Sequence, residues 1–139
     1  MKRFLLDTNV ISELVLSSPN KNLLSWLTEQ EENRIYLSVI TIAEIMRGVA
    51  KLDDSKKKKT LYKWVQNEIP KKFMGRILDF DQEAAFLWGQ WQGEGDRIGK
   101  PKSIMDTQIA AIAVKFKLTL VTRNTKDFTT IPVKIFNPF

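Results

Sequence analysis

The chain has 139 residues, of which 43% are hydrophobic and 27% charged, and this length and composition suit a globular domain. It contains neither cysteine nor histidine, which excludes disulfides, thiolate-held zinc, iron–sulfur clusters, histidine-ligated metals and Ser-His-Asp triads. A formal net charge of +6 at pH 7 favours a polyanionic partner.

The chain shows no targeting or membrane-spanning segment. Its N-terminal Met-Lys-Arg-Phe-Leu-Leu-Asp sequence places only three apolar residues after the two charges, which is too few for a signal peptide. No run approaches the roughly 20 apolar residues of a transmembrane helix. We therefore expect a cytoplasmic protein with residues 1–139 in one domain.

The first half of the chain alternates short apolar strands with amphipathic helices. A strand at 3–6 leads into a helix at 10–16, and a second helix at 22–31 follows the break at Ser17-Ser18-Pro19. A second strand at 34–39 precedes a helix that Thr41 opens, and residues 54–74 continue as helix.

The second half continues this alternation. A third strand at 76–80 precedes a helix that starts at Asp81, and the three glycines and one proline of 93–102 predict a loop. A helix from Ser103 then leads to strands at 119–122 and 133–136. Helical segments between short apolar strands predict a three-layer α/β/α domain with a mostly parallel sheet of about five strands.

Acidic residues recur near the ends of the predicted strands. Asp7 directly follows the first strand, Glu44 lies in the first turn of the helix after the second, and Asp127 follows the fourth. Asp106 lies in the first turn of the helix after the loop. Ligand crevices of parallel sheets lie at the carboxyl edge, and a cluster of carboxylates there favours a divalent cation. Metal-dependent phosphodiesterases use such clusters.

Each of these acids also has an ordinary structural interpretation. Ser/Thr-x-x-Asp/Glu is the pattern of a helix capping box, and acidic residues are favoured in the first turn of any helix. Asp7 alone would serve as an N-cap, and Glu44 would pair with Arg47 one turn along. Only convergence of the four side chains distinguishes a metal site from four caps.

Four blocks of the sequence resemble the PIN-domain nucleases. They are Phe4-Leu-Leu-Asp-Thr-Asn-Val-Ile-Ser-Glu-Leu14, Ala43-Glu-Ile-Met-Arg-Gly48, Met105-Asp-Thr-Gln-Ile-Ala-Ala-Ile-Ala113 and Leu120-Val-Thr-Arg-Asn-Thr-Lys-Asp-Phe128, followed by a C-terminal Asn137-Pro-Phe139. The blocks span nearly the whole chain in the expected order. Within that family the chain is most similar to the VapC-type toxins of toxin–antitoxin pairs, including the FitB-like branch.

The resemblance implies hydrolysis of RNA phosphodiesters with Mg²⁺ or Mn²⁺ held by carboxylates. The family's acidic quartet maps onto Asp7, Glu44, Asp106 and Asp127, with the first three as metal ligands. Supporting positions map onto Thr8, Thr122, Asn124 and Arg47. Many relatives have the fourth acid where this chain has Asn124, three residues before Asp127. The resemblance also implies a homodimer, neutralised by an antitoxin whose tail crosses the active site.

Further features are compatible with more than one interpretation. The lysines at 56–59 form either a solvated helix face or a track for RNA phosphates, and Trp88 and Trp91 either pack in the core or stack on bases. A phosphotransferase of the haloacid dehalogenase type would need a second acid two residues after Asp7, where Asn9 stands. A catalytically inactive RNA- or protein-binding module on the same fold is the other alternative.

Overall fold

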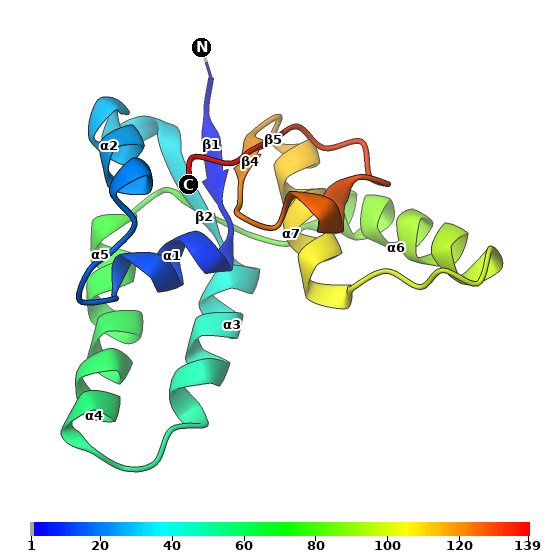
Figure 1. Cartoon of the computed structure of the whole chain (residues 1–139). Coiled ribbons are helices and arrows are strands. Elements are labelled where there is room, and N and C mark those ends of the chain that lie inside the picture. The colour runs from blue at the N-terminus through cyan, green and yellow to red at the C-terminus, as the bar shows by residue number, and fades with distance from the viewer. Residues whose placement is uncertain (1) are drawn as a thin grey trace.

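A five-stranded sheet forms the centre of the computed structural model, which describes residues 2–139. The strand order is β3-β2-β1-β4-β5 and all neighbouring pairs are parallel, as the alternation of strands and helices predicted (Figure 1). The strands are β1 (Phe4–Leu6), β2 (Ile35–Ser38), β3 (Ile77–Leu78), β4 (Thr119–Val121) and β5 (Ile135–Phe136).

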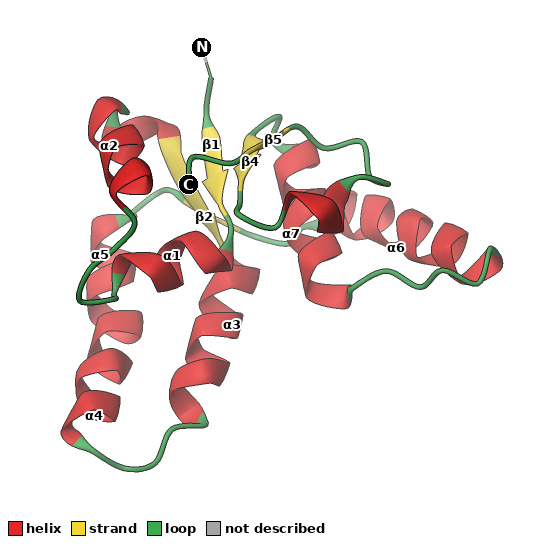
Figure 2. Ribbon diagram, viewed as in Figure 1, coloured by secondary structure: helices red, strands yellow, loops and turns green. Residues whose placement is uncertain are grey.

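Helices cover both faces of this sheet, which confirms the α/β/α layering (Figure 2). They are α1 (Thr8–Leu14), α2 (Lys21–Glu29), α3 (Val39–Ala50), α4 (Lys56–Lys63), α5 (Ile69–Lys72), α6 (Gln82–Arg97) and α7 (Ile104–Lys115). Short 3-10 turns span Glu32–Arg34 and Thr125–Phe128. The helices α1 to α5 pack on one face, while α6 and α7 pack on the other. None of the described helices is long and apolar enough to cross a membrane.

The central strand β1 shows why an uninterrupted apolar run is needed here. Phe4 and Leu6 point into the core beneath α1 to α5, whereas Leu5 points into the core beneath α6 and α7. All three are buried, because successive side chains of a strand face opposite layers and both layers are covered.

The segment predicted as one helix over 54–74 contains a change of helical pitch. Ser55 caps the start of α4 by accepting a hydrogen bond from the Lys58 N–H. A π-helical turn, Trp64–Glu68, then separates α4 from α5, which has a proline in its first turn. Pro70 has no N–H and its ring crowds the preceding turn, so an irregularity of this kind is expected just before it.

The loop predicted at 93–102 is wrong in its first half, because α6 continues to Arg97. Gly95 shows why this helix needs a glycine, because a Cβ at this position would lie 2.7 Å from the Lys100 carbonyl oxygen. The chain turns back through Gly99, at φ +70°, and the Lys100 N–H donates to the Gly95 carbonyl at 2.8 Å. Gly95 therefore permits a close backbone approach instead of ending the helix.

Gly95→Ala and Gly93→Ala are expected to change stability in opposite directions. At Gly95 the new methyl group must displace backbone, which should lower the free energy of unfolding by about 1–3 kcal/mol. At Gly93 nothing lies within 4 Å of the added Cβ, so alanine should raise stability by about 0.5–1 kcal/mol through its helix propensity. Urea unfolding of the two variants checks this, and equal effects would contradict the close-approach explanation.

Candidate active site

Asp7 lies at the carboxyl end of β1 and is the N-cap of α1. Its Oδ1 accepts a hydrogen bond from the Thr8 N–H at 2.8 Å, so the capping interpretation is correct for this residue. The other oxygen, Oδ2, accepts from the Thr122 hydroxyl at 2.8 Å and from the Asn9 amide at 3.2 Å. Asp7 is only 3% exposed, and within residues 2–139 no lysine or arginine forms an ion pair with it, which is unusual for a buried aspartate.

Glu44 approaches the same place from α3. This helix begins at Val39 with Ser38 as its cap, so Glu44 lies in the second turn and not in the first turn of a helix opened by Thr41. The Thr8 hydroxyl donates to Glu44 Oε1 at 2.6 Å. Glu44 therefore belongs neither to a capping box nor to the predicted pair with Arg47, and its side chain turns toward the end of β1.

Asp106 lies in the first turn of α7, where a capping box was the alternative. Ser103 precedes this helix but makes no side-chain capping hydrogen bond, so the reciprocal pattern of a capping box is missing. Asp106 instead lines the same pocket as Asp7 and Glu44. Figure 2 shows why: α1, α3 and α7 all begin near the carboxyl ends of the strands.

The three carboxylates line one open pocket of about 390 Å³. The pKa of Asp7 is raised to about 6. Burial is the main cause and the negative charges of Asp106 and Glu44 add to it, whereas hydrogen bonds from Thr122 and Thr8 lower the pKa. The prediction that acids from distant segments converge is thus confirmed for Asp7, Glu44 and Asp106. The charges of Asp106 and Glu44 also contribute to raising the pKa of Asp7.

The donor chemistry of this pocket fits a hard divalent cation, because its charged donors are carboxylate oxygens and it has no nitrogen or sulfur ligand. In the described part of the chain, no group of three or more acidic side chains is already arranged to hold a metal ion. Glu44 instead gives one oxygen to the Thr8 hydroxyl. Ligation by all three acids therefore requires side-chain rotation within the pocket.

Thr122 and Asn124, which were predicted as supporting residues, lie beside Asp7. The Thr122 side chain is fully buried, and its hydroxyl, besides donating to Asp7, accepts from the Asn9 amide and the Asn124 N–H, both at 3.0 Å. Asn124 also lines the pocket. Thr122 thus links β4 to the end of β1 through the carboxylate of Asp7.

Two predicted site residues are not brought into the pocket. Asp127 is exposed in the 3-10 turn Thr125–Phe128 and lines a separate hollow with Lys100 and Lys102. Arg47 is exposed on α3, and none of the contacts described here joins it to Glu44. Their spacing along the chain suggested proximity, but the direction of the turn and of the helix face carries both side chains away.

Trp88 and Trp91, for which core packing and base stacking were the two interpretations, belong to the core. Trp91 is buried, and Trp88 packs beside it while donating to the Thr107 hydroxyl at 3.0 Å. The core-packing interpretation is therefore confirmed for both.

Five pocket residues were not predicted as site residues from the sequence: Asn9, Ser12, Glu13, Leu16 and Arg123. From the sequence, Asn9 was considered as the residue in place of a second acid and not as a site residue, yet its side chain joins Asp7, Thr122 and the Arg123 N–H in one network. Glu13 and Arg123 line the pocket and face each other at 3.5 Å. The available signal was the helical spacing of Asn9 and Glu13 after Asp7, which places both on one face of α1.

Comparison with known proteins agrees with this geometry. The family model of the PIN domain matches residues 4–134. Toxin FitB of Neisseria gonorrhoeae is 41% identical over 135 residues, covering 97% of both chains, and VapC ribonuclease Y4jK of Sinorhizobium fredii is 34% identical over 134 residues, covering 96% of both.

Solved structures show the same fold. The crystal structure of FitAcB from Neisseria gonorrhoeae superposes with a TM-score of 0.87 at 41% identity, covering 97% of both chains. The structure of FitAB bound to a DNA fragment gives a TM-score of 0.86 at 40% identity, covering 97% of this chain and 94% of that one. With its full set of strands, three converging acids and a family match over nearly all its length, this chain belongs to the PIN domain family.

Proposed function

We propose that this chain is a divalent-metal-dependent endoribonuclease that acts as the toxin of a toxin–antitoxin pair. The observation that carries the proposal is the shared pocket of Asp7, Glu44 and Asp106, where an almost fully buried carboxylate lies in the field of two others. A fold stabilised only by caps gains nothing from this clustering of negative charge, whereas a bound divalent cation would offset it.

Asp7, Glu44 and Asp106 would hold Mg²⁺ or Mn²⁺. Bound there, such a cation supplies Lewis acidity, which favours ionisation of a water molecule and offsets charge on a phosphodiester. This chemistry needs no histidine as general base, and the chain has none.

Residues of the chain itself would prepare the site. Thr122 and Asn9 fix Oδ2 of Asp7, and Thr8 fixes the position of Glu44. Arg123 lies at the pocket wall with its guanidinium half-exposed beside Glu13. It would contact the phosphate of an incoming RNA, since a guanidinium matches phosphate geometry. Asp127 and Arg47 have no role in this proposal.

The partners follow from the relatives. FitB is named a toxin and Y4jK a ribonuclease, and FitB-like chains have been solved within FitAB complexes. We therefore infer an RNA substrate, an antitoxin encoded nearby, a homodimer and a cytoplasmic location. An antitoxin tail that reaches the carboxylates would oppose their charge with a basic residue.

Two matched variants test the proposal. Purified protein should cleave cellular RNA in Mg²⁺ or Mn²⁺ but not in EDTA. Asp106→Asn should reduce the rate by more than about 100-fold, because even residues that only support metal ligands cost roughly 10–100-fold. Asp127→Asn removes the same charge outside the pocket and should keep near-full activity.

Denaturing gels of labelled RNA measure these rates. Cleavage that persists in EDTA, or equal loss in the two variants, would contradict the metal site. If no RNA is cut while the protein still binds it, the inactive binding module is the better description.

A further inference from the structure

A second pocket lies at the opposite edge of the sheet, where α2 meets the amino ends of β1, β4 and β5. It measures about 760 Å³. Its wall contains the cations Lys2, Arg3, Lys117 and Lys134, the aromatic residues Phe4, Trp26 and Phe136, and no acidic residue. The proposed catalytic carboxylates are at the other end of the strands, so this pocket has no part in that chemistry.

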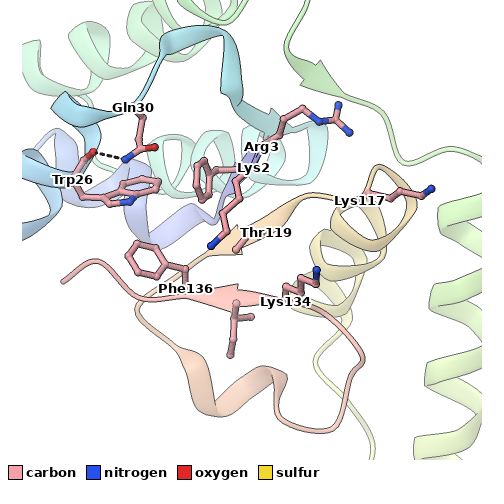
Figure 3. A pocket seen from close by; sticks show the side chains of 10 residues that line it. Lys2, Arg3, Trp26, Gln30, Lys117, Thr119, Lys134 and Phe136 are labelled. Carbon is pink, nitrogen blue, oxygen red and sulfur yellow. Dashed lines mark hydrogen bonds between the residues drawn. The ribbon is translucent and has the colours of Figure 1, made fainter.

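The aromatic rings form a continuous surface in this pocket. Phe4 meets Trp26 edge-on, with ring centroids 4.9 Å apart, and Trp26 meets Phe136 at 5.4 Å. Phe136 is 39% exposed although it is a large apolar residue. Figure 3 shows the rings of Trp26 and Phe136 facing the hollow from α2 and β5. An exposed ring on a rigid aromatic base offers a face for stacking.

Cations surround these rings and are available for an anion. Lys2 and Lys134 are exposed and form no ion pair within residues 2–139. In Figure 3 the Lys2 ammonium group extends between Phe136 and Thr119. Arg3 is turned away, because its guanidinium donates to the Phe116 carbonyl at 2.7 Å. In Figure 3 the Lys117 side chain also extends away from the rings, so the positive charge facing them comes mainly from Lys2 and Lys134.

We propose that this pocket is a second contact site for single-stranded RNA, in which Lys2 and Lys134 bind phosphates and Trp26 and Phe136 stack a base. Aromatic faces interleaved with cations are the shared feature of proteins that hold single strands. The inference rests on the proposed function for its choice of RNA as the polyanion. A duplex would not serve, because its paired bases are not free to stack on a side chain.

The C-terminal segment connects this site with the carboxylate pocket. The Phe136 carbonyl accepts from the Thr122 N–H at 3.0 Å, directly beside the threonine that holds Asp7. At the other end of the segment, the Arg123 guanidinium lies 5.1 Å from the ring centre of Phe139. An RNA strand that runs along residues 136–139 would thus pass from the aromatic pocket to Arg123 at the proposed cleavage site.

Binding in EDTA separates this site from catalysis. The probe is a labelled single-stranded RNA of about 12 nucleotides, within the range that single-strand-binding modules cover. The double variant Lys2→Gln/Lys134→Gln should weaken binding about tenfold and reduce the salt-dependence slope by about 1.4, as expected for two lost phosphate contacts. The matched control Lys51→Gln/Lys71→Gln removes the same charge from exposed positions outside both pockets and should weaken binding less than about twofold.

Substitutions at Phe136 test stacking at a single position. Phe136→Leu keeps an apolar side chain against Trp26 but loses the aromatic face, and it should weaken binding at least about fivefold. Phe136→Tyr keeps the face and should bind like the parent protein. Circular dichroism of both variants verifies that the fold is intact.

Cleavage assays then give an independent readout. Pocket variants should cleave a substrate of about four nucleotides normally, because it is too short to reach both sites, and a longer RNA more slowly. Equal weakening by the two lysine pairs, or equal binding of Phe136→Leu and Phe136→Tyr, would overturn the second site while leaving the nuclease proposal intact. Weaker antitoxin binding with unchanged RNA binding would also overturn it.

Discussion

Without metal, Asp7→Asn is expected to raise the free energy of unfolding at pH 7–8 by about 1–2 kcal/mol. The pKa of Asp7 is raised from an ordinary 3.8 to about 6 by burial and by the charges of Asp106 and Glu44. Ionising this group in the folded protein therefore costs about 3 kcal/mol more than in the unfolded chain. Asparagine avoids that cost, but part of the gain in stability is lost, because its NH₂ group cannot accept hydrogen bonds from the donors that face Asp7.

The direction with pH follows from proton binding. Between about pH 3.8 and 6 the folded protein binds more protons at Asp7 than the unfolded chain, so stability falls as pH rises through this window. The full penalty is present above the folded pKa of about 6. The advantage of the asparagine variant should therefore appear between these limits and vanish, or reverse, near pH 4.

Urea unfolding in EDTA across pH 4–8 measures this difference, and Asp127→Asn is the control because Asp127 is exposed. Near neutral pH, Mg²⁺ should make the parent protein more stable than the Asp7→Asn variant, because it binds the ionised carboxylate of the parent and not the asparagine of the variant. A variant that is less stable than the parent at every pH would mean that Asp7 acts chiefly as a helix cap.

The sequence allowed correct placement of the acids that come soon after the end of a strand. Asp7 is fixed by the end of an apolar run, and Glu44 follows the next strand on a helix that starts at the same edge. In both cases the parallel sheet converts chain position into spatial proximity. Asp106 joins them because α7 starts at this end of the molecule, which its place after a loop left open.

The failures share a physical cause: spacing does not encode the direction of a turn or the reason for a glycine. Asp127 follows β4 closely, yet the 3-10 turn points it toward the Lys100–Lys102 segment. Gly95 reads as a helix breaker, but in the fold it makes room for the Lys100 carbonyl. Asp127 lies beside a segment that comes earlier in the chain, and Gly95 lies beside a residue that comes later. The spacing of acids or glycines along the chain contains neither contact.

Thr122→Val is expected to lower Mg²⁺ affinity about 10–100-fold, as for other residues that support metal ligands. The Thr122 hydroxyl is the donor that fixes Oδ2 of Asp7, and it lowers the pKa of that carboxyl against the effect of burial. Valine has the same shape but no hydrogen-bond donor, so the pKa of Asp7 should rise further. A larger fraction of Asp7 is then protonated, and the cation must displace this proton to bind.

Titration of Mg²⁺ by calorimetry at pH 6 and pH 8 measures the affinity. The loss should be larger at pH 6, where protonation of Asp7 competes most with the metal. Thr122→Ser keeps the hydroxyl and should restore most of the Mg²⁺ affinity. Thr107→Val is the control, because it removes a buried hydroxyl that contacts Ser103, Ile104 and Trp88 and not Asp7. If the Thr122→Val and Thr122→Ser variants bound Mg²⁺ equally at both pH values, Thr122 would be only a packing residue. The link from β4 to the carboxylate of Asp7 would then carry no part of the metal affinity.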